Sequence, residues 1–209
     1  WDHLKTRQGE PDWRWHGRRS GRKLTAARQR LVEHFLPKLR VDPARKLNDL
    51  SALFDCPVRD VWMEIGFGAG EHLLGQANAH PDIGFIGCEP YINGVASLLS
   101  LIESNGAENI RVFDDDVREL IPSLPTACLG RLYLLYSDPW PKTRHHQRRI
   151  TVERNIDAFS RLLRPGAEFR FATDQIEFAQ WTLERFCRDR RFKWLARRVV
   201  DWRRPPVDW

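Results

Sequence analysis

The feature that most constrains the fold of this chain is a regular alternation of short apolar segments with longer amphipathic segments, beginning near residue 60. Apolar runs bounded by polar residues or glycine predict strands, and apolar positions three or four residues apart predict helices. The predicted strands cover residues 60–65, 85–88, 110–113, 131–136, 167–172 and 192–200. The predicted helices cover residues 70–79, 92–103, 151–163 and 176–188. This alternation predicts an α/β fold with a doubly wound, mostly parallel sheet and helices on both faces.

The segment before the first strand has a different character. Residues 1–24 are polar and basic, contain tryptophan and lack periodicity, so we predict an N-terminal arm that is flexible or ordered by a partner. A helix is predicted over residues 26–39, and Pro37 is expected to kink it or end it early. Residues 25–209 are then expected to form a single domain.

Charge indicates the class of partner. Lys and Arg number 34 against 28 Asp and Glu, a formal net charge of +6. The basic residues concentrate in residues 14–30, 142–149 and 185–204, and a basic rim around a neutral centre is typical of a protein that binds a polyanion. For any one of these runs taken alone, a solvated surface is the favoured interpretation.

Cysteine usage and hydropathy indicate the compartment. Cys56, Cys88, Cys128 and Cys187 are scattered, without the spacing of a zinc site or a disulfide framework. No apolar run reaches the roughly 18 residues that a membrane span needs, and no signal peptide opens the chain. We therefore expect a cytoplasmic protein with no metal and no membrane partner. Because the chain begins at Trp1, we also expect that its start is trimmed.

A glycine-rich turn follows the first predicted strand. The segment reads Glu64-Ile-Gly66-Phe-Gly68-Ala-Gly70. Glycines at alternate positions let the backbone turn sharply and let a ligand lie directly against it. The spacing differs from the G-x-G-x-x-G fingerprint of dinucleotide-binding proteins. A tight turn without a ligand is the alternative reading.

Acids follow the next two strands. Glu89 ends the second strand, at the position where nucleotide-binding folds place the acceptor for ribose hydroxyls. The third strand runs into residues 114–116, all Asp, one of which is expected to accept from an adenine amino group. No lysine is placed to bind phosphate, and the acids would repel a pyrophosphate. The pattern therefore favours an adenosine without phosphates, as in S-adenosylmethionine.

The fourth strand ends in the most informative segment, Asp138-Pro-Trp140-Pro-Lys142, which continues as a cationic run through Arg149. The carboxylate of Asp138 is expected to face the reactive methyl group of the cofactor, and the cations are expected to face a nucleic acid. Trp140 is expected either to stack on a displaced base or to pack the loop against the core, and the sequence favours neither role. His145 and His146 are expected to donate to RNA, since no third ligand is spaced to join them on a metal.

These motifs together resemble the bacterial tRNA (guanine-N7-)-methyltransferase family of class I methyltransferases, which have a Rossmann-like sheet. The resemblance rests on Glu64-Ile-Gly-Phe-Gly, Glu89, Asp116, Asp138-Pro-Trp-Pro-Lys142 and Thr173-Asp174, and it extends from about Arg18 to Asp174. It implies methyl transfer from S-adenosylmethionine to N7 of a guanine in tRNA, in the variable loop.

The resemblance also implies roles for individual residues. Asp138 is expected to be catalytic, and the expected cofactor site comprises Glu64, Gly66, Gly68, Gly70, Glu89, Asp116 and Asp138. The expected tRNA contacts are Lys142, Arg144, His145, His146, Gln147, Arg148, Arg149 and Asp174. The family's Thr-x-x-Glu element has no counterpart before Trp209, which we expect to reflect a trimmed C-terminus.

Two other functions fit parts of the pattern. A small-molecule methyltransferase would explain the glycine turn and the acids but not the cationic run. A non-enzymatic RNA-binding protein with a degenerate cofactor site would explain the cations, although the acid after each relevant strand is present. A nicotinamide dehydrogenase fits less well, because its fingerprint and phosphate contacts are missing. The sequence favours neither a monomer nor a homodimer.

Overall fold

The core of the protein is one five-stranded parallel sheet. A computed structural model describes residues 17–203. The strands are β1 (Asp60–Ile65), β2 (Ile83–Cys88), β3 (Ile110–Phe113), β4 (Leu129–Leu135) and β5 (Leu163–Ala172). They lie in the order β3-β2-β1-β4-β5, and every neighbouring pair is parallel. The strand order therefore reverses between β1 and β4, and a ligand site is expected beside the carboxyl ends of these two strands.

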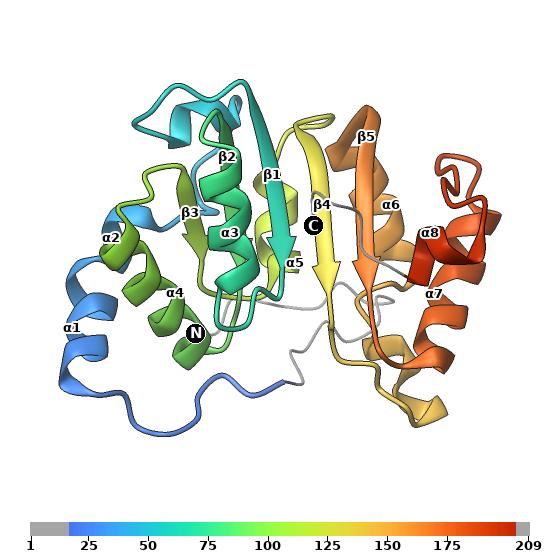
Figure 1. Cartoon of the computed structure of the whole chain (residues 1–209), viewed down its shortest axis with the longest axis horizontal. Coiled ribbons are helices and arrows are strands. Elements are labelled where there is room, and N and C mark those ends of the chain that lie inside the picture. Colours follow the sequence, from blue (N-terminus) through green and yellow to red (C-terminus); the bar gives the residue numbers. More distant parts are fainter. Residues whose placement is uncertain (1–16, 204–209) are drawn as a thin grey trace.

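Helices cover both faces of the sheet (Figure 1). They are α1 (Ala26–His34), α2 (Leu36–Leu39), α3 (Glu71–Ala79), α4 (Ile92–Asn105), α5 (Val117–Leu120), α6 (Glu153–Leu162), α7 (Ile176–Arg188) and α8 (Val199–Arg203). Short 3-10 turns occur at η1 (Leu50–Leu53), η2 (Ile121–Ser123) and η3 (Thr143–Arg148).

The strands supply two hydrophobic cores because successive side chains point to opposite faces. Trp62 of β1 packs in one cluster with apolar side chains of α1 to α4. Its neighbour Met63 packs in the other cluster with side chains of α5, α6 and α7. All residues of β1, β2 and β3 are buried, as is typical of parallel strands covered on both faces.

Most predicted elements are confirmed. The predicted helix over residues 26–39 divides at Phe35 into α1 and α2, and Pro37 stands in the first turn of the second helix, where its missing N–H is tolerated. The doubly wound parallel sheet is also confirmed, although β2, β4 and β5 begin two to four residues earlier than predicted.

The predicted last strand over residues 192–200 is wrong. Residues 192–198 are irregular in the structure, and α8 begins at Val199. Phe192 instead packs on Phe169 and Phe186, with ring centroids 6.4 and 4.8 Å away. A strand needs a neighbour along its length, and an apolar pattern says nothing about whether one is there.

The described part of the N-terminal arm lies against the start of α4. The carbonyl oxygen of Arg19 accepts from the Ile92 N–H at 3.0 Å, and the Gly21 N–H donates to Asn93 at 2.8 Å. Figure 1 shows this segment on the side to which the strand arrows point. The arm therefore reaches the edge of the sheet at which a ligand site is expected. Within residues 17–203, no helix is both long and apolar enough to cross a bilayer.

Candidate active site

The glycine turn after β1 leaves open space in front of its backbone. Gly66, Gly68 and Gly70 have positive φ values of 73°, 58° and 92°. A Cβ atom added to Gly66 or Gly68 would meet nothing within 4 Å, whereas one on Gly70 would lie 2.7 Å from Leu98. Gly70 also precedes α3 as its N-cap residue. The turn therefore requires glycine for its conformation, and it has room for a ligand against the first two glycines.

Glu89 ties the end of β2 to this turn. Its buried carboxylate accepts from the N–H groups of Gly68, at 2.9 Å, and Tyr91, at 3.0 Å. Burial raises the pKa of Glu89, and the nearby carboxylates of Asp138 and Glu64 raise it further. A carboxylate has about four acceptor positions, so hydroxyl groups of a ligand can still bind. The structure thus brings together four of the predicted cofactor residues, Glu64, Gly68, Glu89 and Asp138.

Glu64 is held by a residue that was not predicted. The carboxylate of Glu64 is buried, and its Oε2 lies 2.7 Å from Nδ1 of His72, in the first turn of α3. The ring of His72 also contacts Tyr133 of β4, with centroids 4.9 Å apart. No sequence pattern singles out His72, because its role depends on the packing of α3 over β1 and β4.

Gly94 is a second unpredicted residue of the site. It lies in the first turn of α4, and an added Cβ would be 2.3 Å from the carbonyl oxygen of Gly68. This helix therefore packs backbone to backbone against the glycine turn. A glycine inside a helical pattern is a usable signal of such a close approach.

Asp116 lies at the predicted edge but is engaged by its own neighbour. Its buried carboxylate caps α5 by accepting from the Arg118 N–H, and it also pairs with the Arg118 guanidinium. Asp115 pairs with Arg19 of the arm at 2.8 Å. The carboxylate of Asp116 therefore has a structural role in the cap, and its contact with adenine stays a prediction.

The chain leaves β4 in a conformation that is unusual for its residues. Tyr136 and Trp140 have positive φ values of 51° and 43°, which non-glycine residues rarely adopt. Tyr136 is 70% exposed, although its N–H donates to Ala172 of β5 at 2.8 Å and so continues the strand pairing. Asp138 follows and is exposed. Strained backbone at a strand end often marks a functional site. The sequence carries no signature of this backbone conformation at Tyr136.

The cationic run forms a ledge beside Asp138, which we define as residues 142–149. Lys142, Arg144 and Gln147 are exposed on it, and Arg148 stacks on Trp140 with its guanidinium 5.1 Å from the ring. His145 contacts the edge of the same ring at 5.9 Å. These contacts favour the packing role of Trp140 over base stacking.

Arg149 differs from the rest of the ledge, because its side chain is fully buried. It donates to the carbonyl oxygen of Pro139 at 2.7 Å and to Glu177 of α7 at 2.8 Å. Its guanidinium holds the pKa of Glu177 below the usual range. A guanidinium in this position cannot reach RNA while it makes these bonds, so we correct its predicted role to anchoring the ledge to α7.

The segment after β5 is the last part of the candidate active site at the carboxyl ends of the strands. Asp174 is exposed there, and the preceding Thr173 accepts from the Gln175 N–H through its hydroxyl group at 3.2 Å. Gln175, and not Asp174, is the N-cap of α7. The side chain of Asp174 is therefore not needed to cap the helix and stays a candidate for substrate contact.

Known proteins match nearly the whole chain. A family model described as a putative methyltransferase matches residues 58–205. The tRNA (guanine-N(7)-)-methyltransferase of Rhodospirillum rubrum is 45% identical, and the match covers 95% of this chain and 79% of that protein. The protein of the same name from Nitrobacter hamburgensis is 47% identical, over 92% of this chain and 76% of its own. The chain belongs to the tRNA (guanine-N(7)-)-methyltransferase family.

A solved structure supports the fold assignment of this methyltransferase. Precorrin-6y C5,15-methyltransferase from Geobacter metallireducens GS-15 superposes with a TM-score of 0.52, over 81% of this chain and 73% of its own. Its sequence is 16% identical, so the likeness concerns the fold alone. The predicted Rossmann-like methyltransferase fold is confirmed.

The donor set of the methyltransferase site fits S-adenosylmethionine. A ligand can lie directly against the backbone of Gly66 and Gly68, where there is open space. Glu89, beside it, can accept hydrogen bonds from ribose hydroxyl groups. Glu64 and Asp138 supply negative charge close to Glu89. A cationic sulfonium is favoured beside three carboxylates, whereas a pyrophosphate is repelled.

Proposed function

We propose that the protein transfers a methyl group from S-adenosylmethionine to N7 of a guanine in the variable loop of tRNA. The observation that carries this proposal is the junction of two features at the end of β4. Asp138 is close enough to the carboxylate-lined glycine turn for its charge to raise the pKa of Glu89, and the cationic ledge follows Asp138 directly in the chain. The names of the two relatives described above support tRNA as the substrate.

One set of residues at this junction would bind the cofactor, and another set would bind the tRNA. Glu64, Gly66, Gly68 and Glu89 would hold the cofactor, which supplies an electrophilic methyl group on a positively charged sulfur. Lys142, Arg144 and Arg148 would hold phosphates of the tRNA and orient the RNA at the site. Asp174, which follows the neighbouring strand β5, would contact the guanine.

The acceptor atom explains why the site needs no general base. N7 of guanine has an in-plane lone pair and no proton, so its attack on a methyl group releases none. Most of the rate gain should come from holding N7 in line with the reacting bond, an effect worth up to about 7–11 kcal/mol. Asp138 would accept from N1–H and the amino group of guanine and stabilise the positive charge that develops on the purine. The base must leave its stack or lie in an open loop to be reached in this way.

The test combines label transfer with chemical cleavage. Unmodified tRNA is incubated with the protein and radiolabelled methyl donor, and then treated with borohydride and aniline, which cleave RNA at N7-methylguanine. We expect incorporation of label and cleavage at a variable-loop guanine. Label without cleavage would indicate another acceptor atom. Tight tRNA binding without label would favour the non-enzymatic RNA-binding protein, and labelling of small molecules alone would favour the small-molecule methyltransferase.

We also propose that the reaction takes place in the cytoplasm. Cys56, Cys88, Cys128 and Cys187 are all free thiols in the structure, as is common where the surroundings are reducing.

A further inference from the structure

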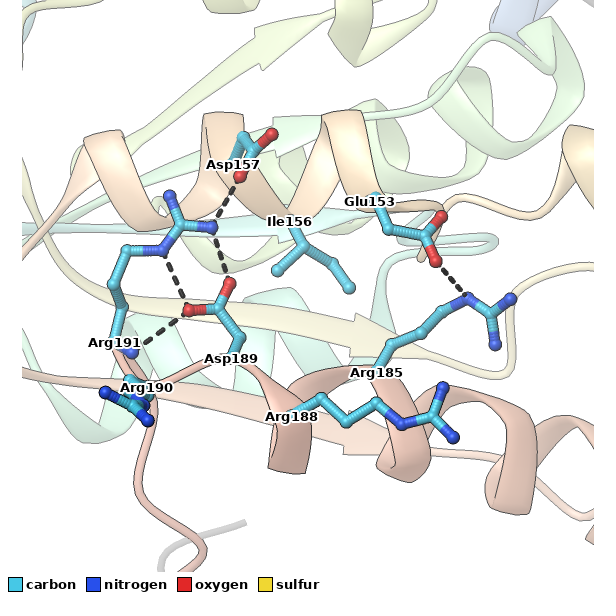
Figure 2. A pocket seen from close by; sticks show the side chains of 8 residues that line it. All are labelled: Glu153, Ile156, Asp157, Arg185, Arg188, Asp189, Arg190 and Arg191. Atoms are coloured by element: carbon cyan, nitrogen blue, oxygen red, sulfur yellow. Dashed lines mark hydrogen bonds and ion pairs between the residues drawn. The ribbon is translucent and has the colours of Figure 1, made fainter.

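An arginine-lined groove lies between α6 and α7, away from the strand ends that carry the candidate active site. Its volume is about 360 Å³, and eight residues of the two helices and the turn after α7 line it (Figure 2). Half of these residues are arginines: Arg185, Arg188, Arg190 and Arg191. Neither the cofactor nor the methylated base would occupy this groove in the proposed reaction.

Two of the four arginines are fixed in place by acids. Figure 2 shows Arg191 bound to both Asp157 of α6 and Asp189, at the end of α7. On the other side of the groove, Arg185 pairs with Glu153 at 3.0 Å. A guanidinium that is already held loses less conformational freedom when a ligand binds.

The other two arginines are available at the rim. Arg188 is 74% exposed in its side chain, and its ion pair is with Glu184, one turn earlier on the exposed surface of α7. Such surface pairs contribute little, so they are readily exchanged for a phosphate. Arg190 is exposed and makes no hydrogen bond or ion pair with any residue among 17–203. The groove therefore presents two guanidinium groups to an anion.

One face of α7 connects the groove to the ledge. Positions 177, 181, 185 and 188 follow each other at helical spacing and share that face. Trp181 contacts the ring of His146 on the ledge at 6.2 Å, and the guanidinium of Arg185 lies 3.4 Å from the Trp181 ring centre. A ligand that occupies the ledge can thus continue along this face into the groove.

The charge of the surrounding segment identifies the kind of ligand. Residues 185–203 contain eight Lys or Arg and two Asp, a net charge of +6, which equals the formal net charge of the whole chain. The remaining residues are therefore neutral in sum. A protein partner would need to be strongly acidic to match this segment, whereas an RNA backbone carries a phosphate at every residue.

We propose that the α6–α7 groove is a second tRNA contact, at which Arg188 and Arg190 bind phosphates of the RNA remote from the methylated guanine. This inference rests on the proposed function, because the ledge must hold the same RNA. From Trp181, which contacts the ledge, to Arg188 the helix rises about 10 Å, at 1.5 Å per residue. A folded tRNA is large enough to contact the ledge and the groove together.

The experiment compares two double charge reversals that change the net charge equally. The test variant is Arg188→Glu with Arg190→Glu. The matched control is Arg45→Glu with Lys46→Glu, two exposed residues near Arg40, which bridges to β3 at the opposite edge of the sheet. Affinity for whole tRNA is measured as a function of salt, together with the melting temperature, the affinity for S-adenosylhomocysteine and N7 methylation.

We expect the groove variant to bind whole tRNA at least about tenfold more weakly than the control, with a salt slope lower by about 2 for two lost phosphate contacts. Its affinity for S-adenosylhomocysteine should be unchanged. If the melting temperature falls, Arg188→Gln with Arg190→Gln should weaken tRNA binding in the same sense, to a smaller extent.

Equal tRNA affinity and salt slope in the groove and control variants would overturn the inference. So would a wild-type dimer that only the groove variant dissociates, because the groove would then be a protein interface. If the wild-type protein binds tRNA through the groove but yields no cleavage at N7-methylguanine, the groove stands and the proposed function fails.

Discussion

At the scale of single residues, the site depends on a buried carboxylate, Glu89, that lies close to two others. Burial raises the pKa of Glu89, and the charges of Asp138 and Glu64 add to this effect. A ligand that donates hydroxyl groups or carries positive charge relieves this repulsion. This concentration of negative charge is thus destabilising by itself and becomes favourable when the cofactor binds.

The raised pKa of Glu89 predicts a pH dependence of cofactor affinity. As the pH falls through this pKa, Glu89 is protonated and loses acceptor capacity, so the affinity for S-adenosylhomocysteine should decrease. The decrease should begin at a higher pH than for a carboxylate with the ordinary Glu pKa of about 4.3. The stability of the ligand-free protein should change in the opposite sense, decreasing as the pH rises through the same pKa.

Titration calorimetry across this pH range can test the prediction. Glu89→Gln should weaken binding about 10- to 100-fold at neutral pH and remove the pH dependence. Glu103→Gln, at an exposed position near the end of α4, is the matched control and should leave both unchanged. A pH dependence that persists in Glu89→Gln would assign the titration to another group.

Asp138 has a different predicted role, in the reacting complex. Asp138→Asn should lower kcat on the order of 10²-fold, because an amide stabilises the developing positive charge of the purine less well than a carboxylate. Its affinity for tRNA should be unchanged, because the ledge supplies that binding. Single-turnover methylation and filter binding measure the two quantities separately. A wild-type rate in this variant would remove Asp138 from the chemical step.

At the scale of elements, the site depends on how closely α4 approaches the glycine turn. Within a helix Gly→Ala ordinarily stabilises, by up to about 0.8–1.0 kcal/mol at an interior position. We expect Gly94→Ala to reverse this sign, because its Cβ would meet the Gly68 carbonyl oxygen at 2.3 Å and displace the turn. Gly75→Ala is the control, since a Cβ on this exposed residue of α3 would meet nothing within 4 Å.

The two alanine variants should therefore differ in both stability and binding. Urea unfolding should show Gly75→Ala to be more stable than the wild type and Gly94→Ala to be less stable. Affinity for S-adenosylhomocysteine should fall only in Gly94→Ala. If both variants were stabilised and bound equally well, α4 would not constrain the turn.

At the scale of the whole molecule, the parallel sheet brings the carboxyl ends of its strands, which carry the candidate active site, to one edge. Arg144 and Arg148 of the ledge follow β4 at this edge, and in the proposed function they hold phosphates of the RNA. Arg144→Glu with Arg148→Glu should weaken binding of whole tRNA and of a short hairpin alike, and each lost phosphate contact should lower the salt slope by about 0.9. Affinity for S-adenosylhomocysteine is the internal control. A variant that still binds the hairpin normally would place the RNA elsewhere.

Many features of this molecule were predictable from the sequence because they depend on local patterns. The apolar runs and the glycine turn predicted the parallel sheet and the position of the site, since parallel strands bring their carboxyl ends to one edge. Glu64, Glu89 and Asp138 were assigned to this edge before their geometry was known, and the electrostatic coupling of Glu89 to the other two agrees with their being close together. The motif around Asp138 and Lys142 predicted the family, which the comparisons confirm.

Only the tertiary structure decided which side chains of these motifs face the solvent and which are held inside. Arg148 and Arg149 are adjacent in the sequence and have nearly the same neighbours. Only Arg149 is buried, against Glu177, because α7 packs beneath the ledge. His72 reaches Glu64, and residues 192–198 fail to form a strand, for the same kind of reason. Each outcome depends on a partner far away in the chain, and local periodicity carries no information about such partners.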